Sequence, residues 1–194
     1  MPEPCKTGKM PLEEAIVRRK SLRCFASEPI SQAQLSQILW AAQGVTDKRR
    51  TVPSAGATYP LEIFVACGGN SLAGLTEGIY HYNCNSHSLS MHFEGDVRAE
   101  LAAAALGQEF MYRVPVDIVI CVDFQRIVFV YGNRAERYVH FEVGHAGQNI
   151  YLQATALGLA TVAVGAFYDE QVSAALHLDR QYKPLYIMSL GKPA

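Results

Sequence analysis

The sequence predicts a single domain of the α+β class, and three observations lead to this prediction. The chain has 194 residues, 49% of them hydrophobic, which is enough for one domain with a sizeable core. Segments with helical periodicity and short apolar or alternating segments typical of strands both occur along it. No internal repeat or linker divides it. Residues 1–10 are polar and contain Pro2 and Pro4, so we expect a flexible tail there and the domain in residues 11–194.

Two helices and three strands are predicted in the first half of the chain. Residues 11–21 place apolar side chains at helical spacing. In residues 31–44, Ser31 and Gln34 form a capping box and Gly44 ends the helix. A polar, basic loop at residues 46–51 precedes strands at residues 61–67, 78–83 and 89–93. The last two strands alternate apolar and polar residues and are joined by turn-forming residues, which predicts a hairpin.

The second half of the chain contains the predicted central strand and the longest helix. An Ala-rich helix is expected at residues 96–106, between two glycines. Residues 115–122 form a continuous β-branched run, which is typical of a strand buried on both faces. The longest helical pattern covers residues 134–157. The remaining segments are a short helix at residues 123–131, a helix at residues 169–176 capped by Asp169, and strands at residues 161–164 and 184–190.

Composition excludes several classes of protein. A net charge of -1 and a pI of about 6.6 argue against nucleic-acid and membrane partners. Five scattered cysteines without C-x-x-C spacing argue against disulfides and structural zinc, so we expect a cytoplasmic protein without a metal. Residues 150–167 are uncharged, but Gly158 lies in the middle of this run, which favours a buried helix followed by a strand over a membrane span.

A cluster of cations is the first candidate site. Arg18-Arg19-Lys20-Ser21-Leu22-Arg23 places four cations and a hydroxyl group within six residues. Arginine offers forked donors that suit phosphate, lysine adds a point charge, and serine adds a hydroxyl group. The alternative is a solvated basic helix end, because short basic motifs are unspecific.

Three further segments have the composition of ligand-binding turns. Small residues and prolines let the backbone approach a ligand closely, and exposed N–H groups after a strand suit an acceptor atom. A cation after the last strand would add to a phosphate site. The three segments are Pro53-Ser54-Ala55-Gly56, Val164-Gly165-Ala166-Phe167 and Gly191-Lys192. Each of them taken alone is also compatible with an ordinary loop.

Together and in this order, the four segments resemble the flavin-dependent nitroreductase family, and in particular its short SagB-like dehydrogenase branch. The resemblance covers nearly the whole chain, from about Leu12 to Pro193. Other matching stretches are Tyr59-Pro60-Leu61-Glu62, Gly144-His145-Ala146-Gly147-Gln148-Asn149 and Gly158-Leu159. The resemblance implies an α+β fold with a central mixed sheet flanked by helices. It also implies a homodimer in which the helix at residues 134–157 forms much of the interface.

The resemblance further implies non-covalently bound FMN at the dimer interface. The phosphate would be held by Arg19, Lys20, Ser21 and Arg23, with Gly191 and Lys192 beside them. The partner subunit would contribute Pro53, Ser54, Ala55 and Gly56. The isoalloxazine ring would lie near Val164, Gly165 and Ala166, with a backbone N–H aimed at N5, and Gln108 is a further polar position near the flavin. No protein acid or base is implied as catalytic, because the cofactor carries the hydride.

The implied activity is a ping-pong reaction in which NADH or NADPH reduces the flavin and a nitroaromatic, quinone or similar electrophile reoxidises it. One alternative is a SagB-like dehydrogenase that oxidises a small or peptide-derived substrate, and another is a flavin-binding protein without turnover. Val130-Tyr131 stands where azoline-oxidising relatives carry Lys-Tyr, which argues against azoline oxidation. The chain lacks the inserted helices of larger relatives, so we expect an open substrate pocket.

Other chemistries have weaker support. We expect His145 to have a packing role, and His81, His87 and His92 to lie on a solvent face of the hairpin. Ser54 has no recognisable His and Asp partners, which argues against a hydrolase. No G-x-G-x-x-G follows a strand, which argues against a Rossmann site. Nucleic-acid binding would have cations but neither the net charge nor a stacking platform.

Overall fold

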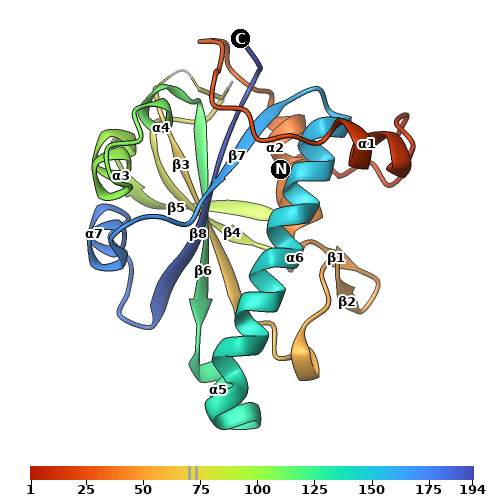
Figure 1. The fold of residues 1–194 in the computed structure, drawn as a ribbon, viewed down its shortest axis with the longest axis vertical. Coiled ribbons are helices and arrows are strands. Elements are labelled where there is room, and N and C mark those ends of the chain that lie inside the picture. Colours follow the sequence, from red (N-terminus) through yellow and green to blue (C-terminus); the bar gives the residue numbers. More distant parts are fainter. Residues whose placement is uncertain (70, 73) are drawn as a thin grey trace.

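A six-stranded sheet is the centre of the computed structural model, which describes residues 1–69, 71–72 and 74–194 (Figure 1). Across the sheet the strands are β5 (Ser88–Glu94), β4 (Gly78–Asn83), β3 (Leu61–Cys67), β6 (Val116–Asp123), β8 (Tyr182–Gly191) and β7 (Ala160–Val164). All residues of β6 are buried, as its β-branched sequence predicts. The predicted α+β class and the central position of this strand are therefore confirmed.

The direction of the strands differs from the mixed sheet that we expected. Each pair of neighbouring strands in the described sheet is antiparallel. The chain leaves β5, passes through α3 (Arg98–Ala104) and α4 (Phe110–Arg113), and returns as β6 antiparallel to β3. The connection from β7 to β8 passes through α7 (Asp169–Ala175) and also joins antiparallel neighbours. A sequence does not reveal these directions, because they depend on where each connection returns to the sheet.

Helices cover both faces of the sheet (Figure 1). On one face, Ile38 of α2 (Gln32–Gln43) and Ile150 of α6 (Ala135–Ala156) share a core with Ile118 of β6. On the other face, Leu101 of α3 shares a second core with Val119 of β6. Because successive side chains of a strand point to opposite faces, β6 contributes to both cores. This double burial explains why its sequence does not alternate.

The ends of two helices test the predicted caps. At α2, the Gln34 N–H donates to Ser31 Oγ at 3.1 Å and the Ser31 N–H donates to Gln34 Oε1 at 2.9 Å, which confirms the capping box. Gly44 is the C-cap, as predicted. At α7 the predicted cap is wrong, because Tyr168 is the N-cap and no side-chain cap bond is present. Asp169 instead begins the helix, where its charge favours the helix dipole.

Several short elements were not predicted. Residues 46–51, expected as a loop, contain most of a small hairpin of β1 (Val45–Thr46) and β2 (Arg49–Arg50). Two single turns of 3₁₀-helix also occur, η1 (Ala55–Ala57) and η2 (Gly132–Arg134), together with α4. The predicted helix at residues 123–131 is present as α5 (Gln125–Tyr131). Elements of two to four residues are too short to leave a periodic pattern in a sequence.

The uncharged run at residues 150–167 is a helix end followed by a strand, as predicted. α6 ends at Ala156, Gly158 has a φ of +68°, and β7 begins at Ala160. Glycine adopts this left-handed conformation without the strain that a side chain would add. Among the helices of the described residues, none combines the length and the hydropathy that crossing a membrane requires.

The first residues, expected as a flexible tail, are hydrogen-bonded to α2 in the structure. The Ser36 hydroxyl donates to the Pro2 carbonyl at 2.5 Å. Cys5 and the Gln37 side chain exchange two hydrogen bonds, of 2.8 and 3.0 Å. These polar residues of α2 are buried, so the segment that covers them satisfies their donors.

Candidate functional site

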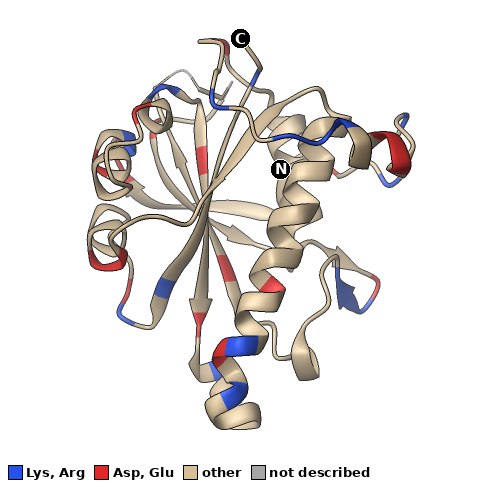
Figure 2. Cartoon of the chain, viewed as in Figure 1, with Lys and Arg blue, Asp and Glu red and all other residues tan. Residues whose placement is uncertain are grey.

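The cation cluster lies in an extended segment, not at the end of a helix. α1 (Leu12–Arg18) ends at Arg18, earlier than predicted, because the backbone of Arg19 (ψ 124°) has left the helical region. The segment then runs beside β7, and the Leu22 N–H donates to the Thr161 carbonyl at 3.0 Å. Figure 2 shows the Lys and Arg residues of this segment between α1 and the C-terminus. The structure therefore presents these cations along a strand edge.

The predicted convergence of the two chain ends is present in the backbone. The Ala26 N–H donates to the Lys192 carbonyl at 3.0 Å, and Phe25 and Pro193 form an antiparallel bridge. Gly191 is buried where an added Cβ would lie 2.9 Å from Pro115 Cδ. That distance is shorter than real contacts allow, so only glycine fits. Gly191 thus permits the close packing that holds the two segments together.

The side chain of Lys192 has a partner that the sequence did not indicate. Its Nζ lies 2.5 Å from Glu28 Oε2. The hydrogen bond and charge of Lys192 lower the pKa of Glu28 below its usual value. In contrast, Arg19, Lys20 and Arg23 have no carboxylate within ion-pair distance among the described residues. This extended segment, residues 19–23, therefore offers three cations without an acidic partner, and we call it the cation segment.

Tyr151 of α6 fixes the cation segment in place, and sequence reasoning missed it. Its hydroxyl lies 2.8 Å from Ser21 Oγ and accepts a hydrogen bond from the Ala163 N–H, also at 2.8 Å. The guanidinium of Arg19 lies over its ring, 5.2 Å from the centroid. One side chain thus joins the segment, α6 and β7. The only signal in the sequence was a tyrosine in an otherwise apolar helical pattern.

The small residues after β7 are exposed next to a second tyrosine. Val164 is buried at the end of the strand, while Gly165 and Ala166 are exposed. The ring of Tyr186 lies between Gly165 and Gly147 of α6, and an added Cβ on Gly147 would lie 3.0 Å from it. Burial, and then the nearby Tyr151, raise the pKa of Tyr186. Of the three residues predicted near the flavin ring, Gly165 therefore borders an aromatic side chain on the same face as Tyr151, while Val164 packs in the core on the other face.

The turn at Pro53–Gly56 lies near the opposite end of α6 (Figure 1). Ser54 Oγ accepts the Tyr59 N–H at 3.0 Å and hydrogen-bonds the Glu142 carboxyl group. Gly56 has a φ of +58°, and an added Cβ would lie 2.9 Å from the Tyr131 hydroxyl. Glu142 and Tyr151 are separated by roughly 14 Å along the helix, at 1.5 Å per residue. Within one chain, the turn and the cation segment are therefore not brought together.

Glu142, which lies beside the turn, and Gln108, which lies between α3 and α4, complete the description. Burial raises the pKa of Glu142 to about 6, against the hydrogen bonds from Ser54 and Gln43. Ala55 is half-buried, and Pro53 is exposed in the same turn. Gln108 lies between α3 and α4, and its amide donates to the Ala105 carbonyl at 3.0 Å. In the described part of the chain, the hydrogen bonds of Gln108 stay within its own loop and the start of α4 and do not reach the cation segment.

The hairpin histidines do not lie on a plain solvent face, which corrects our expectation. His81 pairs with Glu62 at 2.6 Å and stacks on Phe64. His87 hydrogen-bonds the Ser36 and Tyr82 hydroxyl groups at 2.7 and 2.8 Å. Polar partners on neighbouring elements explain their partial burial. Within the described parts of the chain, no three His, Cys, Asp or Glu side chains are grouped so that they could hold a metal.

Replacing Tyr151 by phenylalanine should lower the free energy of unfolding by about 1–2 kcal/mol, because the Ala163 N–H loses its partner. Urea unfolding of the two proteins would measure this change. The matched control is Tyr168→Phe, since Tyr168 is 56% exposed and its hydroxyl group makes no hydrogen bond to another described residue. Equal stability of Tyr151→Phe and the control would show that the hydroxyl group contributes nothing.

Comparisons with known proteins identify the family of this chain. The model of the nitroreductase family matches residues 16–192. A protein of Methanocaldococcus jannaschii whose name assigns it to the nitroreductases is 47% identical over 183 residues, covering 93% of this chain and 90% of that protein. The microcin B17-processing protein McbC of Escherichia coli is 27% identical over 157 residues, and this chain spans 54% of its length.

A solved structure extends the comparison to the fold. A protein from Ralstonia eutropha that is named a nitroreductase has a crystal structure that superposes on this chain with a TM-score of 0.86. The two are 29% identical, and the match covers 100% of this chain and 88% of that one. The predicted nitroreductase-like fold is thereby confirmed. The relationship to McbC agrees with the predicted SagB-like branch. The chain therefore belongs to the nitroreductase family and is a flavin oxidoreductase.

Proposed function

We propose that this chain binds FMN non-covalently and uses NADH or NADPH to reduce a nitroaromatic, quinone or similar electrophile in a ping-pong reaction. One observation carries the proposal. Arg19, Lys20 and Arg23 have no acidic partner among the described residues, and they lie with Ser21 in a segment that runs beside β7. A phosphate dianion is the ligand that suits such a set of donors.

The donor set fits the phosphate of FMN. Arg19 would supply a planar fork, Lys20 and Arg23 further charge, and Ser21 a hydroxyl group already fixed by Tyr151. Lys192 would join them only by exchanging Glu28 for the phosphate, so its contribution is expected to be smaller. This fit concerns charge and hydrogen bonding, the two properties that distinguish a phosphate from most other ligands.

The chain's own residues would orient and enclose the ring. Bound FMN supplies the hydride chemistry, and the protein supplies position and electrostatics. Gly165 and Ala166 are exposed, so their backbone N–H groups can meet a ring nitrogen without a side chain in the way. Tyr186 and Gly147 form the surface beside them. No acid or base of the chain is needed for this role.

A homodimer is part of the proposal, because the segments are separated within one chain. The outer face of α6 exposes Phe141, Gly144, His145 and Gln148. Two copies of α6 packed antiparallel through this face would bring the Pro53–Gly56 turn of one chain to the cation segment of the other. Phe129 of α5, 96% exposed at the same end of α6 as the turn, would be covered in this arrangement.

The relationship to McbC favours a second candidate function, a dehydrogenase that oxidises a small or peptide-derived substrate. The substitution of Val130 for the lysine of azoline-oxidising relatives argues against an azoline substrate. A flavin carrier without turnover is a third candidate. All three share the FMN site and differ in what reduces and what reoxidises the flavin.

The visible absorption spectrum of the purified protein tests the proposal. We expect flavin absorption that is bleached by anaerobic NADPH or NADH and restored by a nitroaromatic or quinone. Flavin that resists both nicotinamides but is bleached by a dehydrogenation substrate would favour the second candidate. A colourless protein that gives no yellow complex with added FMN would refute the cofactor assignment.

A further inference from the structure

Tyr151 of α6 contacts three parts of the proposed flavin site at once. Its hydroxyl oxygen lies 2.8 Å from Ser21 Oγ and 2.8 Å from the Ala163 nitrogen. Its ring faces the guanidinium of Arg19, 5.2 Å from the ring centroid. Ser21 and Arg19 are proposed phosphate ligands, and Ala163 belongs to β7, the strand that leads to the proposed ring site. A side chain with these contacts can act on cofactor binding without touching the cofactor.

The directions of these hydrogen bonds follow from the donors and acceptors present. The Ala163 N–H can only donate, so the Tyr151 oxygen accepts from it. Tyr151 is 9% exposed, and in the described part of the chain Ser21 Oγ is the acceptor within reach of its hydroxyl hydrogen. If Ser21 donated instead, that hydrogen would be buried without a partner, which is costly. Tyr151 therefore donates to Ser21.

This direction makes Ser21 a donor toward a ligand. Ser21 is exposed, and its oxygen already accepts the hydrogen of Tyr151, so its own hydrogen remains available. Each member of a chain of hydrogen bonds polarises the next, which strengthens the last donor of the series. A phosphate dianion offers only acceptors, so it suits this donor better than a ligand hydroxyl group that must itself donate.

The ring of Tyr151 fixes a second proposed ligand of the phosphate. Arg19 is half-buried, and no carboxylate lies within ion-pair distance of it in the part of the chain that the structure describes. Its guanidinium is instead attracted to the face of the aromatic ring. Because the ring occupies only one face of the guanidinium, the N–H groups at the edge can still meet an oxyanion. The hydroxyl group and the ring of Tyr151 therefore act on different ligands.

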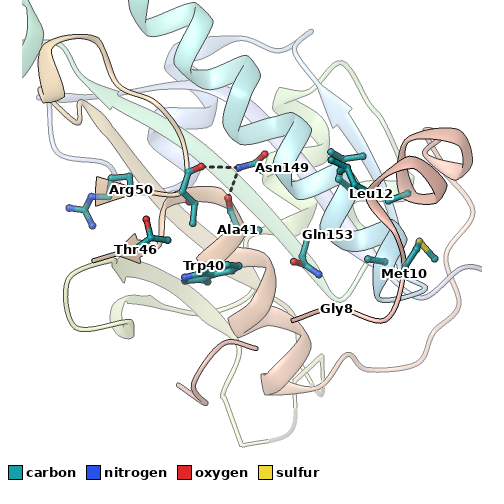
Figure 3. Close-up of a pocket in the computed structure, with 13 residues that line it drawn as sticks. Gly8, Met10, Leu12, Trp40, Ala41, Thr46, Arg50, Asn149 and Gln153 are labelled. Atoms are coloured by element: carbon teal, nitrogen blue, oxygen red, sulfur yellow. Dashed lines mark hydrogen bonds between the residues drawn. The ribbon is translucent and has the colours of Figure 1, made fainter. Parts of the chain in front are cut away.

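The arrangement around Tyr151 is separate from the pocket of about 510 Å³ in Figure 3. That pocket lies beside the end of α6, where Gln153 is one of its lining residues. Tyr151, Ser21 and Arg19 do not line it, so an occupant of the pocket would not account for their contacts.

We propose that Tyr151 is a positioning residue for the flavin phosphate. Its hydroxyl group makes Ser21 an outward donor, and its ring holds the guanidinium of Arg19 in place. This role rests on the proposed function, since it takes the ligand of Ser21 and Arg19 to be the phosphate of FMN. It assigns part of the affinity to a side chain that does not touch the cofactor, and it separates the part due to the hydroxyl group from the part due to the ring.

Titration of the full-length apoprotein with FMN and with riboflavin tests the role of the hydroxyl group. Ser21→Ala should weaken FMN binding about tenfold, because it removes a hydrogen bond to a charged group. Tyr151→Phe should weaken it about three- to tenfold, because Ser21 is no longer oriented. In the Ser21→Ala protein the same change should cost less than about twofold, since no hydroxyl group remains to be oriented. Riboflavin, which lacks the phosphate, should bind all four proteins within about twofold.

A second pair of variants tests the role of the ring. Tyr151→Phe keeps the ring, whereas Tyr151→Leu removes it. With Arg19 present, the leucine variant should bind FMN about threefold more weakly than the phenylalanine variant, because the guanidinium loses its aromatic contact. In the Arg19→Ala protein, the two variants should agree within about twofold.

Tyr80→Phe is the matched control for a loss of stability alone. Tyr80 of β4 is 4% exposed, and its hydroxyl group donates to the Thr76 carbonyl at 2.9 Å. The change therefore removes the hydroxyl group of another buried tyrosine and its hydrogen bond, at a position without contact to the cation segment. It should leave the Kd values for FMN and for riboflavin within about twofold of the wild-type values.

Three results would overturn this role, and they separate it from the proposed function. Equal affinity of the wild-type protein for FMN and riboflavin would remove the phosphate site, and the role of Tyr151 with it. A clear preference for FMN, with the same loss from Tyr151→Phe whether or not Ser21 has its hydroxyl group, would keep the phosphate site and reject the role of Tyr151. Parallel losses of FMN and riboflavin binding in Tyr151→Phe would show that the variant only disturbs the fold.

Discussion

Replacing Asp117 by asparagine is expected to stabilise the protein at pH 8 and to reduce the change of its unfolding free energy between pH 5 and pH 8. Asp117 lies fully buried in β6. The Ser189 hydroxyl donates to its Oδ1 at 2.5 Å, but its Oδ2 has no partner. Burial raises the pKa of Asp117 from 3.8 to about 7, against this hydrogen bond and the charge of Arg98. A neutral amide avoids the cost of burying the ionised acid.

The sign of the effect follows from the direction of the shift. Because the folded state raises the pKa, Asp117 contributes stability fully below pH 3.8, and this contribution is lost as pH rises through about 7. Between pH 5 and pH 8 the loss amounts to about 3 kcal/mol for a shift of this size. Urea unfolding at both pH values would measure it, and the advantage of Asp117→Asn should grow by that amount.

Asp123, at the other end of the same strand, provides a matched control. Its carboxylate accepts the Gln125 N–H at 3.0 Å and lies 3.3 Å from the guanidinium of Arg126. Asp123→Asn should therefore lower stability, because it removes a charged acceptor before the first turn of α5 and an ion pair. If Asp117→Asn instead destabilises the protein equally at pH 5 and pH 8, the carboxyl group is not forced to ionise in a buried site.

Replacing Arg19 by alanine is expected to weaken FMN binding by roughly 1.5–3 kcal/mol, which corresponds to about 10- to 150-fold in Kd. Arg19 begins the cation segment and has no acidic partner among the described residues. Its loss would remove a charge-assisted hydrogen bond to the phosphate. Fluorescence titration of the apoprotein with FMN would measure the change, and binding by riboflavin, which lacks the phosphate, should be unaffected.

Arg18 is the control, because it is the adjacent cation but points elsewhere. Its guanidinium pairs with Glu14 of α1 at 2.6 Å and its side chain is largely exposed. Arg18→Ala should leave the Kd for FMN within about twofold, since exposed ion pairs contribute little. Equal losses in both variants would indicate a diffuse electrostatic attraction and would remove Arg19 from the phosphate site.

The elements that could be predicted are those with long or distinctive patterns. β3 and β4 have the predicted limits, and α6 differs by one residue at each end, because burial on one or both faces imposes a period on many residues. The two-residue strands β1 and β2 and the cap of α7 could not be predicted, because each depends on one or two local contacts.

The residues of the candidate site also fall into those that the sequence predicts and those that it does not. Charge and small residues identify the cation segment and the end of β7, and these lie on neighbouring elements. Tyr151 and Glu28 could not be found, because a hydrogen bond or ion pair between residues far apart in sequence leaves no local signal. The separation of the Pro53–Gly56 turn from the cation segment could not be predicted either. It follows from the three-dimensional structure, in which the two segments contact α6 at Glu142 and at Tyr151.

The hydrogen bonds of the cation segment also constrain the order of events during synthesis. Residues 22 and 26 leave the ribosome early, but their backbone partners are Thr161 and Lys192, which are made near the end. The segment must therefore wait without these partners while most of the sheet is translated, and its docking closes a long loop. A nascent chain stalled before β7 would carry the proposed phosphate ligands without the strand that orders them.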